Sequence, residues 1–86
     1  MSIDREKIVG LSLGTLFGVC GFYYTNYEKH GRYSIGVDKI SEFMGILLFY
    51  VAAVLSSELV STVLLQMIAA WHIANAVYYW DETPWL

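Results

Sequence analysis

The sequence predicts an all-α integral membrane protein with three transmembrane helices. Three observations lead to this fold class: the composition, two long runs without charge, and a polar break inside the second run. The 86 residues are 57% hydrophobic and only 15% charged, whereas soluble domains carry about a quarter charged residues. A soluble fold of this size would leave apolar patches exposed. The composition therefore excludes a water-soluble globule and a disordered chain, and residues 1–86 form a single membrane domain.

The first transmembrane helix is predicted at about residues 8–24. This run of 17 residues has no charged side chain and lies at the lower end of the roughly 17–25 residues that cross a bilayer. Residues 1–7 form a short polar N-terminus. In a signal peptide this segment would be positively charged, but Asp4 and Glu6 balance Arg5 and Lys7. We therefore expect a helix and no cleaved leader.

The second apolar run is too long for one crossing. Residues 43–80 contain 38 residues with Glu58 as the single charged side chain, and an unbroken helix of that length would measure about 57 Å against a hydrocarbon core of about 30 Å. Ser56, Ser57 and Glu58 form a polar cluster, and serine at an N-cap followed by glutamate favours a helix start. We predict helices at about 39–55 and 59–80 joined by a tight turn. The alternative is one long helix with Glu58 near its middle.

Polar segments and aromatic residues indicate where the chain leaves the membrane. We expect residues 25–38 to form an extramembrane loop, with His30 in water or paired with a nearby carboxylate, and residues 81–86 to form a tail. Aromatic residues close the first and last predicted helices, as rings do at headgroup level. Three crossings place both aromatic groups on the same side, together with Tyr33. Two basic residues before the first helix against three after it set no orientation.

Small residues recur at helical spacing on the first two predicted helices. Four glycines fall within roughly an 80° stripe of the first helix: Gly10, Gly14, Gly18 and Gly21. A weaker stripe on the second helix contains Ser41, Gly45, Ala52 and Ser56. Because small residues let helix backbones approach closely in lipid, both stripes predict packing faces. The two grooves meet each other or a helix of another protein.

The third predicted helix has a polar face opposite an apolar one. The polar and small face comprises Glu58, Ser61, Thr62, Gln66, Ala69, His72, Asn75 and Ala76. Polar side chains inside a bilayer face protein or water, so this helix is expected to be packed along its whole length. Three short helices offer little surface to cover it, which indicates partner subunits.

Glu58 and His72 each admit a chemical interpretation beside a structural one. A carboxylate at mid-membrane would carry ions, and a glycine-lined helix paired with it resembles the general plan of rotary ATP synthase proteolipids, although the glycine spacing and the loop differ from that family. We expect Glu58 at a surface turn instead. His72 could ligate haem, a pigment or copper through a ring nitrogen, but a hydrogen bond to a neighbouring helix is the expected role.

No set of residues with catalytic spacing is apparent, nor a metal quartet or a phosphate-binding loop. Five basic against eight acidic residues exclude the basic field of a nucleic-acid binder. The sequence thus predicts a non-catalytic accessory subunit of a respiratory, photosynthetic or membrane-oxidase complex, contacting other membrane subunits and lipids and holding no cofactor of its own. The alternative is a ring-forming ion-translocating proteolipid that uses Glu58. The expected location of the protein is the mitochondrial inner membrane or a bacterial or archaeal plasma membrane.

Overall fold

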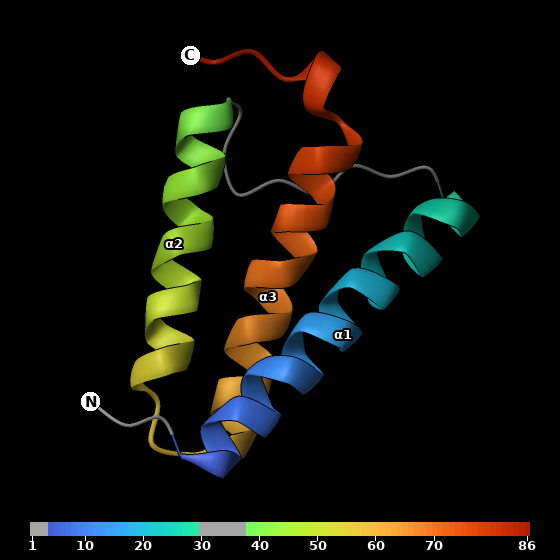
Figure 1. Ribbon diagram of the computed structural model, residues 1–86. Helices are drawn as coiled ribbons and strands as arrows, with labels where there is room; N and C mark the ends of the chain where they lie inside the picture. The colour runs from blue at the N-terminus through green and yellow to red at the C-terminus, as the bar shows by residue number, and fades with distance from the viewer. Residues whose placement is uncertain (1–3, 30–37) are drawn as a thin grey trace.

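The computed structural model describes residues 4–29 and 38–86, and their fold is all-α (Figure 1). Three α-helices follow one another along the chain: α1 at Arg5–Lys29, α2 at Lys39–Leu55 and α3 at Leu59–Tyr78. A short 3-10 helix, η1, follows at Trp80–Glu82. The described residues contain no strand. The all-helical fold class is therefore confirmed.

Helix α3 lies in the middle, with α1 and α2 on either side of it (Figure 1). It runs parallel to α1 and antiparallel to α2, and α1 scarcely touches α2. The Cα atoms extend over 38 × 29 × 14 Å. Because α1 and α2 both pack on α3 and scarcely on each other, the three helices form a single layer.

Helix α1 is longer at both ends than the expected residues 8–24. Its start is capped by Asp4, whose side-chain oxygen accepts a hydrogen bond from the Lys7 amide at 2.8 Å. The polar residues beside the apolar run continue the helix to Lys29, since a helix can extend beyond its apolar stretch. His30 and Tyr33 lie outside the described residues.

The chain reverses at residues 56–58, so the alternative of one long second helix is wrong. Ser56 (φ −65°, ψ 142°) and Glu58 (φ −115°, ψ 140°) both adopt extended backbone angles. Any residue can adopt these angles, so neither position requires glycine. The expected serine N-cap is also corrected: Ser56 is the C-cap of α2, and Glu58 is the N-cap of α3.

The core of the layer is made mainly of small residues. The buried hydrophobic residues are Phe22, Ile46, Ala53, Ala69, Ala70, Ala74 and Ala76. Large aliphatic and aromatic side chains instead lie exposed on the outer surfaces of all three helices. This is the reverse of a soluble domain, in which the large apolar residues fill the interior.

Among the described residues, two helical segments are long and apolar enough to cross a membrane: Arg5–Asn26 in α1 and Leu59–Tyr78 in α3. Only 22% and 39% of their most apolar stretches are buried within the chain, whereas a core helix of a soluble protein is mostly buried. The outward faces of both helices are therefore suited to lipid or to other membrane helices.

Candidate functional site: the polar contacts of the central helix

The glycines of α1 form the contact between α1 and α3. A Cβ atom added at Gly14 would lie 2.7 Å from the Val63 carbonyl oxygen, and one at Gly18 would lie 2.5 Å from the Met67 carbonyl oxygen. Gly10 faces Thr62 in the same way, with 2.9 Å to its Cγ2 atom. Because two of these neighbours are backbone atoms that cannot move aside, a larger residue would push the helices apart. The glycine stripe thus meets α3 of its own chain.

Two polar residues of α3 are buried against α1 beside these glycines. Gln66 donates a hydrogen bond from Nε2 to Oγ1 of Thr15 at 3.0 Å, and Thr15 Oγ1 donates to the Leu11 carbonyl oxygen at 2.8 Å. Thr62 is 1% exposed and donates its hydroxyl to the Glu58 carbonyl oxygen at 2.9 Å. Polar groups of α3 therefore find acceptors inside the chain itself, including backbone carbonyls.

The face of α2 that packs on α3 is displaced from the expected stripe. Gly45, Ile46 and Ala53 are buried at this contact, whereas Ala52 is exposed. Ala53, the following residue, faces α3 instead, because α2 turns toward α3 the side on which Glu42 lies. The small residues expected on one face, Ser41, Gly45, Ala52 and Ser56, are thus divided between buried, half-buried and exposed positions.

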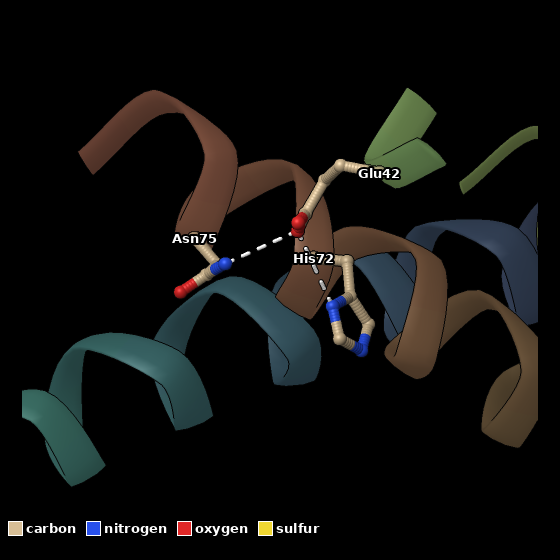
Figure 2. A network of polar contacts seen from close by, with 3 residues as sticks. All are labelled: Glu42, His72 and Asn75. Carbon is tan, nitrogen blue, oxygen red and sulfur yellow. Dashed lines mark hydrogen bonds and ion pairs between the residues drawn. The ribbon is translucent and has the colours of Figure 1, made fainter. Parts of the chain in front are cut away.

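The most enclosed polar group between α2 and α3 is formed by Glu42, His72 and Asn75 (Figure 2). Glu42 is 2% exposed and Asn75 is fully buried. Asn75 donates from Nδ2 to Glu42 Oε1 at 3.1 Å, and His72 Nδ1 lies 3.5 Å from the same oxygen. Neither Asn75 Oδ1 nor His72 Nδ1 makes a hydrogen bond. A buried carboxyl group in this setting requires polar partners, and α3 supplies two of them.

Lys7 joins all three helices at the end of the bundle near the turn. Its ammonium donates to the Ala53 carbonyl oxygen at 3.2 Å, to the Ser56 carbonyl oxygen, and to Thr62 Oγ1 at 3.1 Å. The last carbonyls of a helix have no partner within the helix, and a cation suits the negative end of the helix dipole. Lys7 of α1 therefore caps the C-terminus of α2.

The segment after α3 folds back on the start of α2 at the opposite end. Lys39 is 8% exposed, and its ammonium donates to the Thr83 carbonyl oxygen at 2.8 Å. The same ammonium lies 4.4 Å from the ring centre of Trp80 and 4.9 Å from that of Trp85, distances at which a cation is attracted to an aromatic face. The backbone amide of Lys39 also donates to the Pro84 carbonyl oxygen at 2.8 Å.

Aromatic residues of α1 and α3 meet at this same end. Phe22 is fully buried, and its ring packs edge-to-face with those of Trp71 and Tyr78 at 6.1 and 5.8 Å. Tyr79 donates its hydroxyl to Asn26 Oδ1 at 2.8 Å. The aromatic ends of the first and last helices therefore lie together at one end of the bundle.

Glu58 does not belong to a buried stripe. Its side chain is exposed at the turn, it makes no capping hydrogen bond, and it lines a shallow recess with Asp4, Glu6 and Lys7. Of the polar residues expected to be buried on α3, the structure buries Thr62, Gln66 and Asn75, whereas Ser61 and His72 are half-buried. Glu58 is exposed because it precedes the first turn of α3. Its side chain therefore does not lie on the face of α3 that packs against the other helices.

Sequence reasoning missed two residues that hold the helices together, Glu42 and Lys7. A signal for Glu42 was available, because Glu42 and His72 are each fifteen positions from Ser57. In an antiparallel hairpin centred on that turn, residues at equal distances face each other. The contacts of Lys7 depend on how α1 docks against the hairpin, and no sequence spacing indicates that.

The described charges lie at the two ends of the layer, with Glu42 as the buried exception. At the turn end they are Asp4, Arg5, Glu6, Lys7 and Glu58, and at the opposite end they are Asp38, Lys39, Asp81 and Glu82. Residues 4–29 and 38–86 include no group of three His, Cys, Asp or Glu side chains that could hold a metal ion. Chemically, the polar groups described above can join helices.

No family model, curated protein or solved structure matches this chain.

Proposed function

We propose that the chain is a small, non-catalytic accessory subunit of a larger membrane complex, packing between the helices of other subunits. One observation carries this proposal: the buried polar groups of the described helices point toward one another inside the layer, while the outer surfaces are apolar. A protein built in this way acts through contact with apolar surroundings. Lipid covers the outer faces that no partner covers, and no cofactor is proposed for the chain itself.

The single-layer shape supports a place between larger subunits. All three helices expose large apolar side chains, and the smallest Cα extent of the layer is 14 Å. Leu48 on α2 and Leu16 on α1 are 70% and 55% exposed. A flat element of this kind fits between bundles of core helices, where it buries surface on both sides.

We further propose that all three helices cross the membrane. Because α1 and α3 are parallel, two crossings in the same direction require that the chain return between them. Helix α2 is the returning element in this proposal. Its 17 residues measure about 25 Å, slightly less than the hydrocarbon core of about 30 Å. The polar groups of Lys39 and Ser56, at the two ends of α2, cover the remaining distance to the membrane surfaces. The charges gathered at the two ends of the layer agree with this arrangement.

The kind of complex and the kind of membrane are proposed from the composition and the patterns of the sequence. The complex is of the respiratory, photosynthetic or membrane-oxidase type, and the membrane is the mitochondrial inner membrane or a bacterial or archaeal plasma membrane. We therefore propose electron transport as the process that the complex serves.

Purification from the native membrane tests the accessory role. A tagged chain is extracted in gentle detergent, separated on a native gel and analysed by mass spectrometry. We expect it to migrate with a defined set of larger membrane subunits, whose identities name the process. Migration as a stable, functional monomer would contradict the proposal, and so would a ring made of this chain alone.

Photo-crosslinking sharpens the test, because it locates the contact on the chain. A photoreactive amino acid replaces Leu48 on the outer face of α2 or Leu16 on the outer face of α1, and Ala53, which is fully buried, serves as the matched internal control. We expect at least one outer position to crosslink to a different protein of defined mass. Crosslinks to lipid alone at both outer positions would count against a packed subunit.

The proteolipid alternative gains no support from the position of Glu58. An ion-carrying carboxylate acts from within the membrane, and Glu58 is exposed at the turn beside charged residues. We expect Glu58→Gln to leave complex assembly and membrane ion conductance unchanged. Loss of conductance in this variant would revive the alternative.

A further inference from the structure

The end of α3 and the helix η1 form an open recess that takes no part in the contacts between the three α-helices. It is lined by Val77, Tyr78, Trp80, Asp81 and Glu82, all of which are exposed. Its volume of about 490 Å³ lies within the range of sites that hold small molecules, about 300–1,000 Å³. The accessory role does not use this recess.

Two carboxylates form the polar wall of the recess. Within residues 4–29 and 38–86, neither Asp81 nor Glu82 makes a side-chain hydrogen bond or an ion pair. Asp38 adds a third carboxylate at this end of the layer, and the ammonium of Lys39 is turned away to the Thr83 carbonyl oxygen at 2.8 Å. The recess is therefore a place of negative potential, which attracts cations.

The walls of the recess are held in place by the chain itself. The backbone amide of Glu82 donates to the Tyr79 carbonyl oxygen at 3.1 Å, which closes the turn of η1. The ring of Trp80 packs against those of Trp85 and Phe43, with ring centres 5.6 and 6.0 Å apart. Because these contacts form without a ligand, a molecule that enters the recess meets preformed walls.

The recess continues into an apolar face of α3. Ile73 and Val77 are 45% and 64% exposed, and residues four apart lie on the same face of a helix. In the proposed crossing of α3, this face points into the hydrocarbon, and the rings of Tyr78 and Trp80 lie at the membrane surface, where such rings are common. The order from the membrane outward is thus apolar, aromatic and acidic. A phospholipid with an amine headgroup has the matching order, because its ammonium lies farthest from the acyl chains.

We infer that the recess binds a phospholipid whose headgroup ends in a primary ammonium, as in phosphatidylethanolamine. A primary ammonium has three N–H donors, and the Asp81 and Glu82 carboxylates accept them in charge-assisted hydrogen bonds. The acyl chain lies along Ile73 and Val77. This inference rests on the proposed crossing of the membrane by α3.

The same walls disfavour the other common headgroups. A choline headgroup has no N–H donor for the carboxylates, and its quaternary ammonium would need a free aromatic face. The Lys39 ammonium already lies 4.4 Å from the centre of the Trp80 ring, so a second cation at that ring would be repelled. An anionic headgroup is repelled by the carboxylates themselves.

Lipid retention tests the inference. The full chain is reconstituted in vesicles of equal parts phosphatidylethanolamine, phosphatidylcholine and phosphatidylglycerol. It is then extracted in gentle detergent with a chelator of divalent cations, and native mass spectrometry identifies the lipids that remain bound. We expect phosphatidylethanolamine to be enriched about two- to fivefold over each of the others, the effect of an exposed ion pair.

A pair of matched double variants locates the site. Asp81→Asn combined with Glu82→Gln keeps the size of both side chains and is expected to abolish the enrichment. Glu6→Gln combined with Glu58→Gln removes the same two charges at the turn end and is expected to keep it. If the first variant does not fold, the wild type decides: stepwise N-methylation of the ethanolamine headgroup removes its donors one at a time and should lower the enrichment at each step.

Three results would overturn the inference. The first is equal retention of the three lipids by the wild type. The second is an enrichment that survives the loss of both carboxylates or the full methylation of the headgroup. The third is an enrichment that requires divalent cations, because a metal ion would then be what the carboxylates bind. None of these results bears on the accessory role, which co-purification tests, and labelling from the two sides of the membrane tests the crossing of α3 separately.

Discussion

The two sides of α3 are held by different means. Toward α1 the contact is close, because Gly14 and Gly18 let the two helices approach until an added Cβ would meet the main chain of α3. Toward α2 the contact depends on side chains, with Glu42 bonded to Asn75 near the start of α2. Lys7 and Lys39 add polar contacts at the two ends of α2.

The difference shows two ways in which helices associate. In the proposed membrane location, lipid removes the hydrophobic driving force between them. Close packing gains dispersion energy over many weak contacts and does not depend on pH, whereas interhelical hydrogen bonds in membranes are worth only about 1 kcal/mol each. We therefore expect α1 and α3 to behave as a firm pair and α2 as the more separable helix. The following predictions test this contrast.

The largest effect is expected at the glycine contact. Gly18→Ala places a methyl group 2.5 Å from the Met67 carbonyl oxygen, and it should lower the free energy of unfolding by about 3 kcal/mol relative to Gly21→Ala, since overpacking against backbone has no easy relief. Gly21→Ala is the matched control, because its methyl group meets the movable Trp71 ring at 2.9 Å. Unfolding in detergent micelles measures both. Equal effects would show that the contact is not close-packed.

The second-largest effect on stability is expected when the charge of Lys7 is removed. Lys7→Met deprives Ala53, Ser56 and Thr62 of a charged donor and should cost about 2 kcal/mol. Arg5→Met in the same turn is the control, because Arg5 is exposed, and it should change stability by less than about 0.5 kcal/mol. Detergent unfolding with a reporter on α2 should show that helix released first. A loss of similar size in both variants would mean that net charge, and not the capping contact, is responsible.

A smaller effect is expected inside the contact of α2 with α3. Asn75→Ala removes the donor to Glu42 and should cost about 1 kcal/mol. Disulfide trapping between cysteines on α2 and α3 should slow, while trapping between α1 and α3 stays as fast as before. Ser61→Ala on the same helix is the control. If the trapping rates of both helix pairs fall together, the two sides of α3 are not independent.

The smallest effect concerns the segment that folds over α2. Trp85→Ala removes one of the two rings beside the Lys39 ammonium and should cost about 0.5–1 kcal/mol. Tryptophan fluorescence, with quenching from water, should show Trp80 more accessible than before. Leu86→Ala, at a residue 88% exposed, should leave the quenching unchanged. An unchanged signal from Trp80 in Trp85→Ala would mean that the segment is held by its backbone bonds alone.

Much of the fold could be predicted from the sequence because length and charge determine it. The 38 residues from Phe43 to Trp80 are too long for one crossing. The polar cluster at residues 56–58 marks the position at which the helix is interrupted. The periodicity of the glycines placed the packing face of α1. None of these inferences required knowledge of how the helices meet.

The partners of individual residues were not predictable in the same way. The glycine groove could equally have faced α2 or another protein, because spacing shows a face and not its neighbour. Whether Ala52 or Ala53 faces α3 depends only on the rotation of α2 about its axis. Glu42, which faces α3, helps to set this rotation. The polar face of α3 indicated partner subunits, whereas the structure shows that Thr62, Gln66 and Asn75 already bond within the chain.

The crossing of the membrane by all three helices underlies the proposals above, and labelling from each side tests it directly. In a Cys20→Ser background, Ser57→Cys lies at the turn and Asp81→Cys lies at the opposite end of the layer. A membrane-impermeant maleimide is applied to sealed vesicles of both orientations. We predict that the two cysteines react in vesicles of opposite orientation, and reaction of both from the same side would contradict the account.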